Sequence, residues 1–371
     1  MINEKPDLTT MGQASKAKVR PLLSTDSTED LARLRILAFP HLPESYDHEW
    51  HSSLWRWLER YPLAGEMHRW VVEAGGEVVG HLAALPQYYR IGGQQVIAHT
   101  PAHYMVLPQY SFYAISLMRK FFATCRNCVA ADYFPRVISI EKRFGAQETG
   151  KLRFWVKVWD LSVRSTLPIL AYRPVSQVSS YGLREIDRAL NGTLLEDNLK
   201  VEVLEGFDES FDELFESVAA VVPCTPEKDA AFLHWRYGFG SPQAPATVLG
   251  VKDRGTLLGY TVLWINVEAN GYLLDLVTHP NRRDVAIALL RETSHYFRQR
   301  RVRSVRYRFA ESVTSPRSRE LLRLGFLPVN VREKQGTLLT KFADSRLHQT
   351  ATDISNWSYT SGDGELTYWV R

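Results

Sequence analysis

The chain has 371 residues and a formal net charge of +4, from 45 basic and 41 acidic residues. This length is enough for two domains of ordinary size. The charge excess is too small to indicate a nucleic-acid-binding protein, and the absence of any run of about 18 uncharged apolar residues argues against a membrane span.

The N-terminal residues 1–17 are polar and lack the apolar core of a secretory signal, so we expect a flexible tail and a cytoplasmic protein. Three cysteines are too few for a disulfide framework. Cys125 and Cys128 form a CxxC, but no second pair completes a zinc site. We therefore expect these cysteines to pack in the interior, and we expect no metal.

Residues 18–162 predict a strand and a helix, a hairpin, a strand ended by proline, a helix, a strand, a helix ended by glycine, and a last strand. The corresponding stretches are 18–39, 68–95, 96–108, 111–125, 128–134, 136–146 and 151–161. Gly75-Gly76 is typical of a hairpin turn, and Gly145 suits a left-handed helix C-cap.

Residues 199–340 predict nearly the same order of elements. The stretches are 199–207, 211–222, 246–266, 271–280, a helix from 284, 302–310, 315–326 and a final strand. Local strings also match, because "VVGHLAAL" at Val78 parallels "LLGYTVLW" at Leu257, and "EKRFGA" parallels "LRLGFL". We interpret 163–198 as a connector and the aromatic extension 341–371 as a segment that packs back.

This order of elements resembles that of the GCN5-related N-acetyltransferase (GNAT) family, and the chain resembles two such domains in tandem. The strings "DAAFLHWRYGFGSP", "LLGYTVLW" and "NWSYTSGDGE" are similar to those of bacterial tandem-domain acyltransferase-like proteins of polysaccharide or natural-product pathways. The resemblance implies an α/β (α+β) fold with two mixed, mostly antiparallel twisted sheets flanked by helices.

The resemblance also implies an acyl-CoA donor (acetyl-CoA or longer), with an acyl carrier protein as the alternative carrier, and an amine of a small molecule or sugar as acceptor. In the family the pantetheine arm pairs with a strand edge, and the pyrophosphate lies on a glycine-containing loop at a helix N-terminus, where free N–H groups favour anions. In the first half these positions correspond to Met105, Val106, Leu107, Ser111, Phe112, Tyr113, Ala114, Ser116 and Arg119.

The loop of the first half departs from the family pattern because serine replaces its arginine and larger residues replace its glycines. Phe112 and Tyr113 either block the phosphate approach or stack on an adenine. The alternative is a packed strand–helix corner without a ligand. We prefer the first half as the donor site, since no acidic residue opposes a phosphate there.

The second half offers Arg283, Ala286 and Ala288 at the equivalent turn, together with Asp284 in the first helical turn. A carboxylate at that place satisfies the helix dipole and repels a pyrophosphate. We therefore expect a corner that caps itself, and we keep these residues with Asp275 as the candidate site of the second half.

Acyl transfer to an amine needs a base and is helped by an acid for the leaving thiolate. His103 and Asp275 each lie five residues before the turn proline, on the strand where the family often carries a base, although a hydrogen-bonded structural role is the alternative. The family's tyrosine acid is replaced by Glu141 in the first half. Glu141 suits the role if burial raises its pKa, and Tyr133 is a second candidate.

Two other clusters have open interpretations. Trp235, Arg236 and Tyr237 in "FLHWRYGF" form either an acceptor pocket or a packing contact between domains. The arginine run "RQRRVRSVRYR" at 298–308 indicates either a solvated face or the binding site of an anionic partner.

The sequence therefore predicts an N-acyltransferase of the GNAT type. A binding or scaffold protein that has lost its chemistry is the first alternative. An aminoacyl-tRNA-dependent transferase is the second, but the chain has no lysine-rich RNA-binding insertion. We expect no membrane contact and no nucleic-acid partner.

Overall fold

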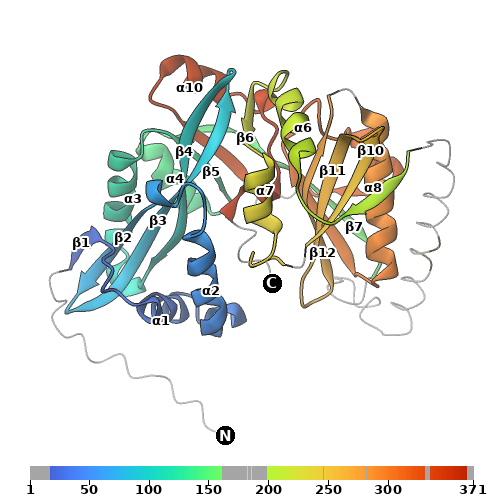
Figure 1. Cartoon of the computed structure of the whole chain (residues 1–371). Coiled ribbons are helices and arrows are strands. Elements are labelled where there is room, and N and C mark those ends of the chain that lie inside the picture. Colours follow the sequence, from blue (N-terminus) through green and yellow to red (C-terminus); the bar gives the residue numbers. More distant parts are fainter. Residues whose placement is uncertain are drawn as a thin grey trace, which may run out of the picture.

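The computed structural model describes residues 17–160, 182, 185, 199–244, 246–280, 282–330 and 335–365, and all structural statements refer to these. Figure 1 shows two twisted sheets side by side, with helix α7 (Ala230–Tyr237) between them. Each sheet is mainly antiparallel, contains one parallel strand pair and is flanked by helices. The fold class predicted from the sequence is confirmed.

The first sheet has the order β1-β2-β3-β4-β5-β15-β6, and β9 pairs with β3 outside this path. Its strands are β1 (Lys18–Pro21), β2 (His68–Ala74), β3 (Glu77–Ile91), β4 (Gln94–Val106), β5 (Cys128–Asp132), β6 (Gln147–Lys151), β9 (Cys224–Pro226) and β15 (Thr337–Lys341).

The second sheet has the order β14-β7-β13-β12-β11-β10-β8. Its strands are β7 (Arg153–Val158), β8 (Val201–Leu204), β10 (Thr247–Asp253), β11 (Thr256–Ile265), β12 (Asn270–Thr278), β13 (Ser304–Phe309) and β14 (Leu327–Pro328).

The two halves of the chain exchange strands. β7 comes from the first half but pairs with β13 and β14 of the second sheet, whereas β15 comes from the second half but lies between β5 and β6 of the first. Only Leu152 separates β6 from β7, so the chain passes from one sheet to the other within one residue. The predicted domain limits 18–162 and 199–340 therefore separate two stretches of the sequence, but each sheet contains a strand from the other stretch.

The structure contains the helices that the sequence predicts and three more, namely α2, α7 and α10. The described helices are α1 (Thr28–Ala38), α2 (His48–Leu58), α3 (Tyr113–Thr124), α4 (Pro135–Arg143), α6 (Glu209–Ala219), α7, α8 (Arg283–Gln299), α9 (Ser318–Arg323) and α10 (Ser345–Ala351). Gly145 and Gly325 follow α4 and α9 with φ of 93° and 79°, the left-handed conformation that glycine adopts without strain. Helix α2 is absent from the sequence-based elements.

The parallel strand pair of each sheet opens into a wedge. β4 and β5 are paired only at His99 and Cys128, and we call the space beyond them the first wedge. β12 and β13 are paired from Asn270 to Leu273, and the space beyond them is the second wedge. His103, with φ of 52°, interrupts the pairing of β4 with β3, a β-bulge that bends the strand beside the first wedge.

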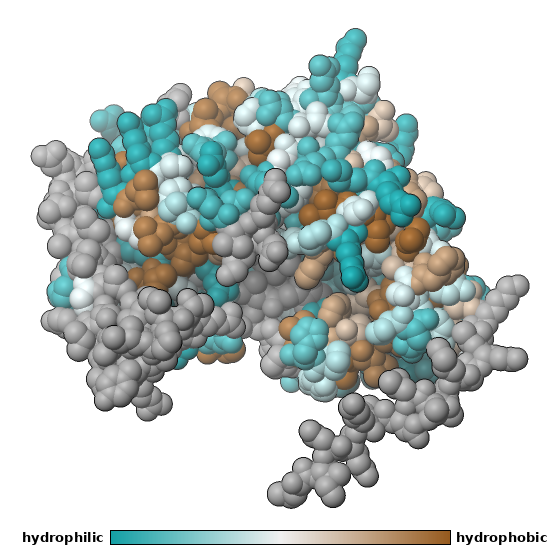
Figure 2. All heavy atoms as spheres, turned by 180° about the vertical axis from the view of Figure 1, so that it is seen from behind, coloured by the Kyte–Doolittle hydropathy of each residue, from teal (hydrophilic) through white to brown (hydrophobic). Residues whose placement is uncertain are grey.

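Seen from behind, the surface drawn in colour carries hydrophobic patches interspersed with hydrophilic residues (Figure 2). Among the described residues, no helix is long and apolar enough to cross a membrane. The cysteines Cys125, Cys128 and Cys224 are buried thiols.

Candidate functional site

The first wedge contains a cavity of about 250 Å³. His103 and Tyr104 of β4 form one wall, and Ala130, Ala131 and Asp132 of β5 form the other. The remaining lining comes from β4, from α1, α3 and α4, from the loops that follow α1 and β5, and from the C-terminal segment: Arg35, Phe39, Leu42, Thr100, Pro101, Met118, Tyr133, Phe134, Val137 and Glu365. This volume is near the lower end of the range of small-molecule sites.

The bulge turns one backbone donor toward the cavity. The N–H of His103 donates a 2.6 Å hydrogen bond to Oε1 of Glu365, which also lines the cavity. A distance this short is typical of a hydrogen bond to a charged acceptor. The wedge therefore holds a main-chain donor that binds an anionic oxygen.

The side chain of His103 is less suited to proton transfer than its sequence position indicates. The residue is 2 % exposed, and its ring lies 4.6 Å from that of Trp55. Burial lowers the pKa of His103 well below its usual value, and the neighbouring His81 and Arg35 lower it further. The imidazole is therefore neutral at pH 7 and is a weak base.

Glu141 has the property that the sequence analysis required of an acid. Its side chain on α4 is fully buried, and burial, followed by the charge of Asp132, raises its pKa well above the usual value. Neither carboxyl oxygen has a hydrogen-bond partner among the described residues. Glu141 is not part of the cavity lining. Burial raises the pKa of Tyr104, which does line the cavity, and the charge of Glu141 raises it further. It is therefore a protonated acid behind the cavity wall.

Tyr133 lies where three spaces meet. It lines the first wedge, an open groove along α4 and β6, and a small cavity between the two sheets. Burial raises the pKa of Tyr133, and the Arg308 guanidinium, 5.3 Å from its ring, opposes the rise. The phenol therefore keeps its proton at neutral pH, and its hydroxyl lies close to Gly336, directly before β15.

The predicted donor-loop residues surround the N-terminus of α3 without filling the wedge. Phe112 is 75 % exposed, and the Tyr113 hydroxyl donates to the Ala17 carbonyl at 2.9 Å, away from the cavity. The helix begins without a side-chain cap. The structure therefore leaves its first N–H groups without a competing carboxylate. The cavity is lined by Met118, one turn after Ala114 in α3. It is not lined by the other predicted residues of this region: Met105, Val106, Leu107, Ser111, Ala114, Ser116 and Arg119.

The second wedge is occupied by the C-terminal segment of the same chain. Thr360 bridges to Phe309 of β13, the N–H of Ala310 donates to the Tyr359 carbonyl at 2.7 Å, and the turn η7 (Ser361–Asp363) contacts both β12 and β13. A side chain at Gly362 would overlap the Leu274 carbonyl, so the segment approaches β12 as closely as glycine allows.

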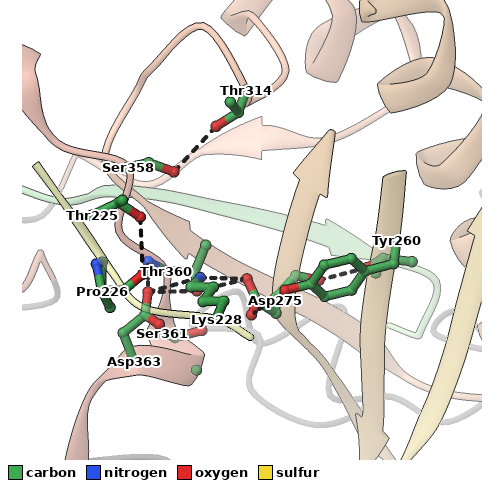
Figure 3. Close-up of polar contacts among 12 residues, drawn as sticks. Thr225, Pro226, Lys228, Tyr260, Asp275, Thr314, Ser358, Thr360, Ser361 and Asp363 are labelled. Carbon is green, nitrogen blue, oxygen red and sulfur yellow. Dashed lines mark hydrogen bonds and ion pairs between the residues drawn. The ribbon is translucent and has the colours of Figure 1, made fainter. Parts of the chain in front are cut away.

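A buried network of ion pairs and hydrogen bonds connects this segment to β12 (Figure 3). Lys228 lies 2.8 Å from Asp275 and 3.0 Å from Asp363, and the Thr360 hydroxyl donates to Asp275 at 3.1 Å. Asp275 is 1 % exposed and is therefore ion-paired and hydrogen-bonded in the interior. Burial raises the pKa of Asp363 to about 6, against the opposing charge of Lys228.

In the turn before α8, the charges of Arg282 and Asp284 neutralise each other. Arg282 binds the carboxylate of Asp284 in the first helical turn through Nε at 3.0 Å and Nη2 at 2.7 Å. Ala286 and Ala288 are buried against the core, and Arg283 starts the helix. Arg282 thus neutralises the carboxylate that was expected to oppose a phosphate at this turn. Neither the first wedge nor the small cavity between the two sheets is lined by Asp275, Arg283, Ala286 or Ala288.

The cluster on α7 joins the two halves. The rings of Trp235 and Trp57 stack at 4.3 Å, and each indole N–H donates to the other residue's carbonyl, at 3.1 and 2.8 Å. Arg236 donates to the carbonyls of Gly362 and Gly364, and Tyr237 packs beneath the same segment. Trp235 and Arg236 also line a cavity of about 20 Å³ that shares Thr100 and Glu365 with the first wedge.

Glu365, Lys228 and Asp363 lie near these sites and were not selected from the sequence, whereas Arg308 belongs to the arginine run that was. The "NWSYTSGDGE" string was the available signal for the C-terminal carboxylates, but the sequence does not indicate which wedge it enters.

No protein-family model and no curated protein sequence matches this chain. Several solved structures, however, are similar to this chain. A GCN5-related N-acetyltransferase from Anabaena variabilis is 14% identical, with a TM-score of 0.55, over 89% of this chain and 73% of that one. N-myristoyltransferase from Saccharomyces cerevisiae with bound myristoyl-CoA is 12% identical, with a TM-score of 0.58, over 92% and 82%.

A tandem GNAT protein from the clavulanic acid biosynthesis pathway is 17% identical, with a TM-score of 0.51, over 89% of this chain and 99% of that chain. At sequence identities this low, the structural matches establish the fold of the chain but do not identify its substrates. The chain therefore has a tandem GNAT fold, the fold that its sequence resembles.

Proposed function

We propose that the protein is an N-acyltransferase that holds an acyl-CoA or acyl-carrier thioester in the first wedge and transfers the acyl group to an amine. The observation that carries the proposal is the contrast between the two wedges. The first contains a cavity of about 250 Å³, whereas the second is filled by the chain's own C-terminal segment. The second half then serves as structural support.

The donor would enter with its phosphates at the uncapped N-terminus of α3 and its pantetheine arm along β4. The thioester carbonyl would accept the His103 N–H that now binds Glu365. A backbone N–H fixed by a bulge is a suitable donor to the developing oxyanion, since it needs no reorganisation.

The displaced Glu365 carboxylate is our candidate for the base. It would take a proton from the acceptor amine as the nitrogen attacks the carbonyl carbon and the carbonyl electrons move to oxygen. The tetrahedral intermediate would then collapse, the C–S bond would break, and Tyr133 would donate its proton to the leaving thiolate. Glu141, whose pKa is raised by burial, does not line the cavity and would take no direct part in the transfer.

The test uses Ala114, in the first turn of α3. Coenzyme A is expected to raise the melting temperature of the wild type. Ala114→Glu places a carboxylate about 5 Å from the phosphates, which repels them by roughly 3 kcal/mol at an effective dielectric near 20 and abolishes the shift. The same carboxylate stabilises the helix N-terminus, so the variant should remain folded.

The matched control is Ala114→Gln, which has nearly the same size without the charge and should retain most of the shift. No shift of the wild type at millimolar coenzyme A would overturn the donor assignment. Binding of acetyl-CoA without release of free thiol in the presence of any amine would support the scaffold alternative.

A further inference from the structure

Helices α3 and α4 pack against each other beside the first wedge (Figure 1). Met118 of α3 and Val137 of α4 line the same cavity, and the rings of Phe122 and Phe144, near the C-terminal ends of the two helices, stack with their centres 5.7 Å apart. The helices therefore run in the same direction, and their outward faces form one surface. Phe134 lines the cavity and is 65 % exposed, so the cavity lies directly beneath this surface at the N-terminus of α4.

This surface carries an excess of positive charge. Helix α3 contains no acidic residue, and the single acidic residue of α4, Glu141, is buried. Glu148, the exposed carboxylate that follows α4, is already paired with Lys142 at 3.4 Å and Lys151 at 3.5 Å. Five exposed cations of this region have no ion pair among the described residues: Arg119, Lys120, Arg126, Arg136 and Arg143. Their charge is therefore available to a partner.

Two exposed aromatic side chains accompany these cations. Phe112 directly precedes α3 and is 75 % exposed, and Phe134 directly precedes α4. Exposed aromatic residues beside arginines are typical of protein–protein interfaces, and unpaired surface cations attract an acidic partner and increase its rate of association. The cations and the two aromatic residues, which we call the α3–α4 surface, therefore have the composition of a docking site for an acidic protein.

We infer that the α3–α4 surface binds an acidic carrier protein, so that the preferred donor is a thioester on the phosphopantetheine arm of that carrier. The inference rests on the proposed function, in which the phosphate of the donor lies at the N-terminus of α3. A protein that presents its arm there must cover the neighbouring surface. The reaction is unchanged, with the pantetheine thiol of the carrier as leaving group.

The extent of the positive charge favours a carrier protein over coenzyme A alone. Lys120 and Arg143 each lie about 10 Å along the helix axis from the N-terminus of their own helix. The screening length at physiological ionic strength is about 8 Å, so these cations contribute little to phosphates bound at the N-terminus of α3. They are therefore placed to contact a larger ligand.

The experiment measures the affinities for a carrier protein and for coenzyme A separately, by calorimetry at physiological ionic strength. The probes are an acyl carrier protein with its phosphopantetheine arm, the same protein without the arm, and coenzyme A. The charge-reversal variant is Lys120→Glu/Arg143→Glu, because neither residue lines the first wedge. The matched control is Lys200→Glu/Arg254→Glu, at an exposed lysine and an exposed arginine of the second half. Circular dichroism checks that both variants are folded.

The wild type should bind the carrier with its arm at least about tenfold more tightly than the carrier without it, since the arm adds contacts in the wedge. Lys120→Glu/Arg143→Glu should bind the carrier at least about tenfold more weakly than the wild type but bind coenzyme A within about twofold, and the control should retain both affinities.

The outcomes separate the inference from the proposed function. Unchanged carrier affinity in Lys120→Glu/Arg143→Glu, or a wild type that binds coenzyme A but no carrier, would overturn the inference and leave the proposed function intact. The inference would also be overturned if the surface bound single-stranded RNA or anionic vesicles in place of the carrier. Binding of neither the carrier nor coenzyme A by the wild type would refute the proposed function itself.

Discussion

The backbone N–H of His103 and the side chain of Glu365 are joined by a 2.6 Å hydrogen bond although 262 positions separate them in the chain. This bond lies where the bulge of β4 meets the C-terminal segment that fills the second wedge. One segment thus closes the second wedge and places a carboxylate in the first. Substitutions can therefore test both the carboxylate in the first wedge and the ion-pair network that holds the segment in the second wedge.

The first prediction concerns Glu365. Glu365→Ala frees the His103 N–H and removes the base, so the KM for the donor should fall or stay constant while kcat falls by about 10²-fold or more. Glu365→Gln keeps an acceptor for the N–H, so its donor KM should equal that of the wild type while its kcat is equally low. Steady-state kinetics separate these effects, and a kcat within about threefold of the wild type in both variants would exclude the role of base.

The second prediction concerns Lys228. Lys228→Met leaves Asp275 and Asp363 buried beside each other without a compensating charge, which should lower the free energy of unfolding by about 3–5 kcal/mol. Urea denaturation measures the change. The exposed Lys18→Met is the control, because its ion pair with Glu73 lies at the surface and should contribute no more than about 1 kcal/mol. Equal effects of the two changes would contradict the role of the network.

The third prediction is the pH dependence that Asp363 causes. Its pKa is about 6 in the native state against 3.8 for a free aspartate, so the native state binds this proton more tightly than the unfolded state. The resulting stabilisation is complete below about pH 3.8 and is lost as the pH rises through 6, with a total of about 3 kcal/mol at most. Asp363→Asn does not titrate there. The stability of the wild type relative to this variant should therefore fall between pH 4 and pH 7, and a constant difference in urea denaturation would refute the assignment.

The fourth prediction concerns the stacked pair Trp57 and Trp235. Each single change to alanine should lower the free energy of unfolding by about 3–5 kcal/mol. The double variant should lose less than the sum of the two single losses, by about 0.5–1.5 kcal/mol for the rings and more if the reciprocal indole hydrogen bonds contribute. Strict additivity in the double-mutant cycle would show that the two halves are not coupled through this pair.

Much of the fold follows from local patterns. The Gly75-Gly76 turn, with both φ values positive, and the glycine caps after α4 and α9 are required by backbone geometry at those residues, so the sequence predicts them. Helix α2 was missed although its sequence carries the signals of a helix, since Asp47 caps it and the buried residues Trp50, Leu54, Trp57 and Leu58 recur at helical spacing.

The exchange of β7 and β15 between sheets could not be predicted, because strand pairing between distant segments leaves no local periodicity. The candidate site likewise contains some residues that the sequence can identify and others that it cannot. His103 and Glu141 were selected by their spacing from a proline and from Gly145, and Tyr133 by its place just after a strand, since all of these signals are local. The approach of Glu365 to His103, and of Arg308 to Tyr133, depends on how the second sheet packs on the first.

The most direct measurement of the central claim is the affinity for acetyl-CoA after the first wedge is filled. Val137 of α4 lines only that cavity among those described, and Val137→Trp should fill it without adding charge; Val221→Trp, at a position 52 % exposed elsewhere, is the matched control. Calorimetry should show that Val137→Trp binds acetyl-CoA at least tenfold more weakly than the wild type, while Val221→Trp binds it equally well. Wild-type affinity in the folded Val137→Trp variant would contradict the assignment of the first wedge as the donor site.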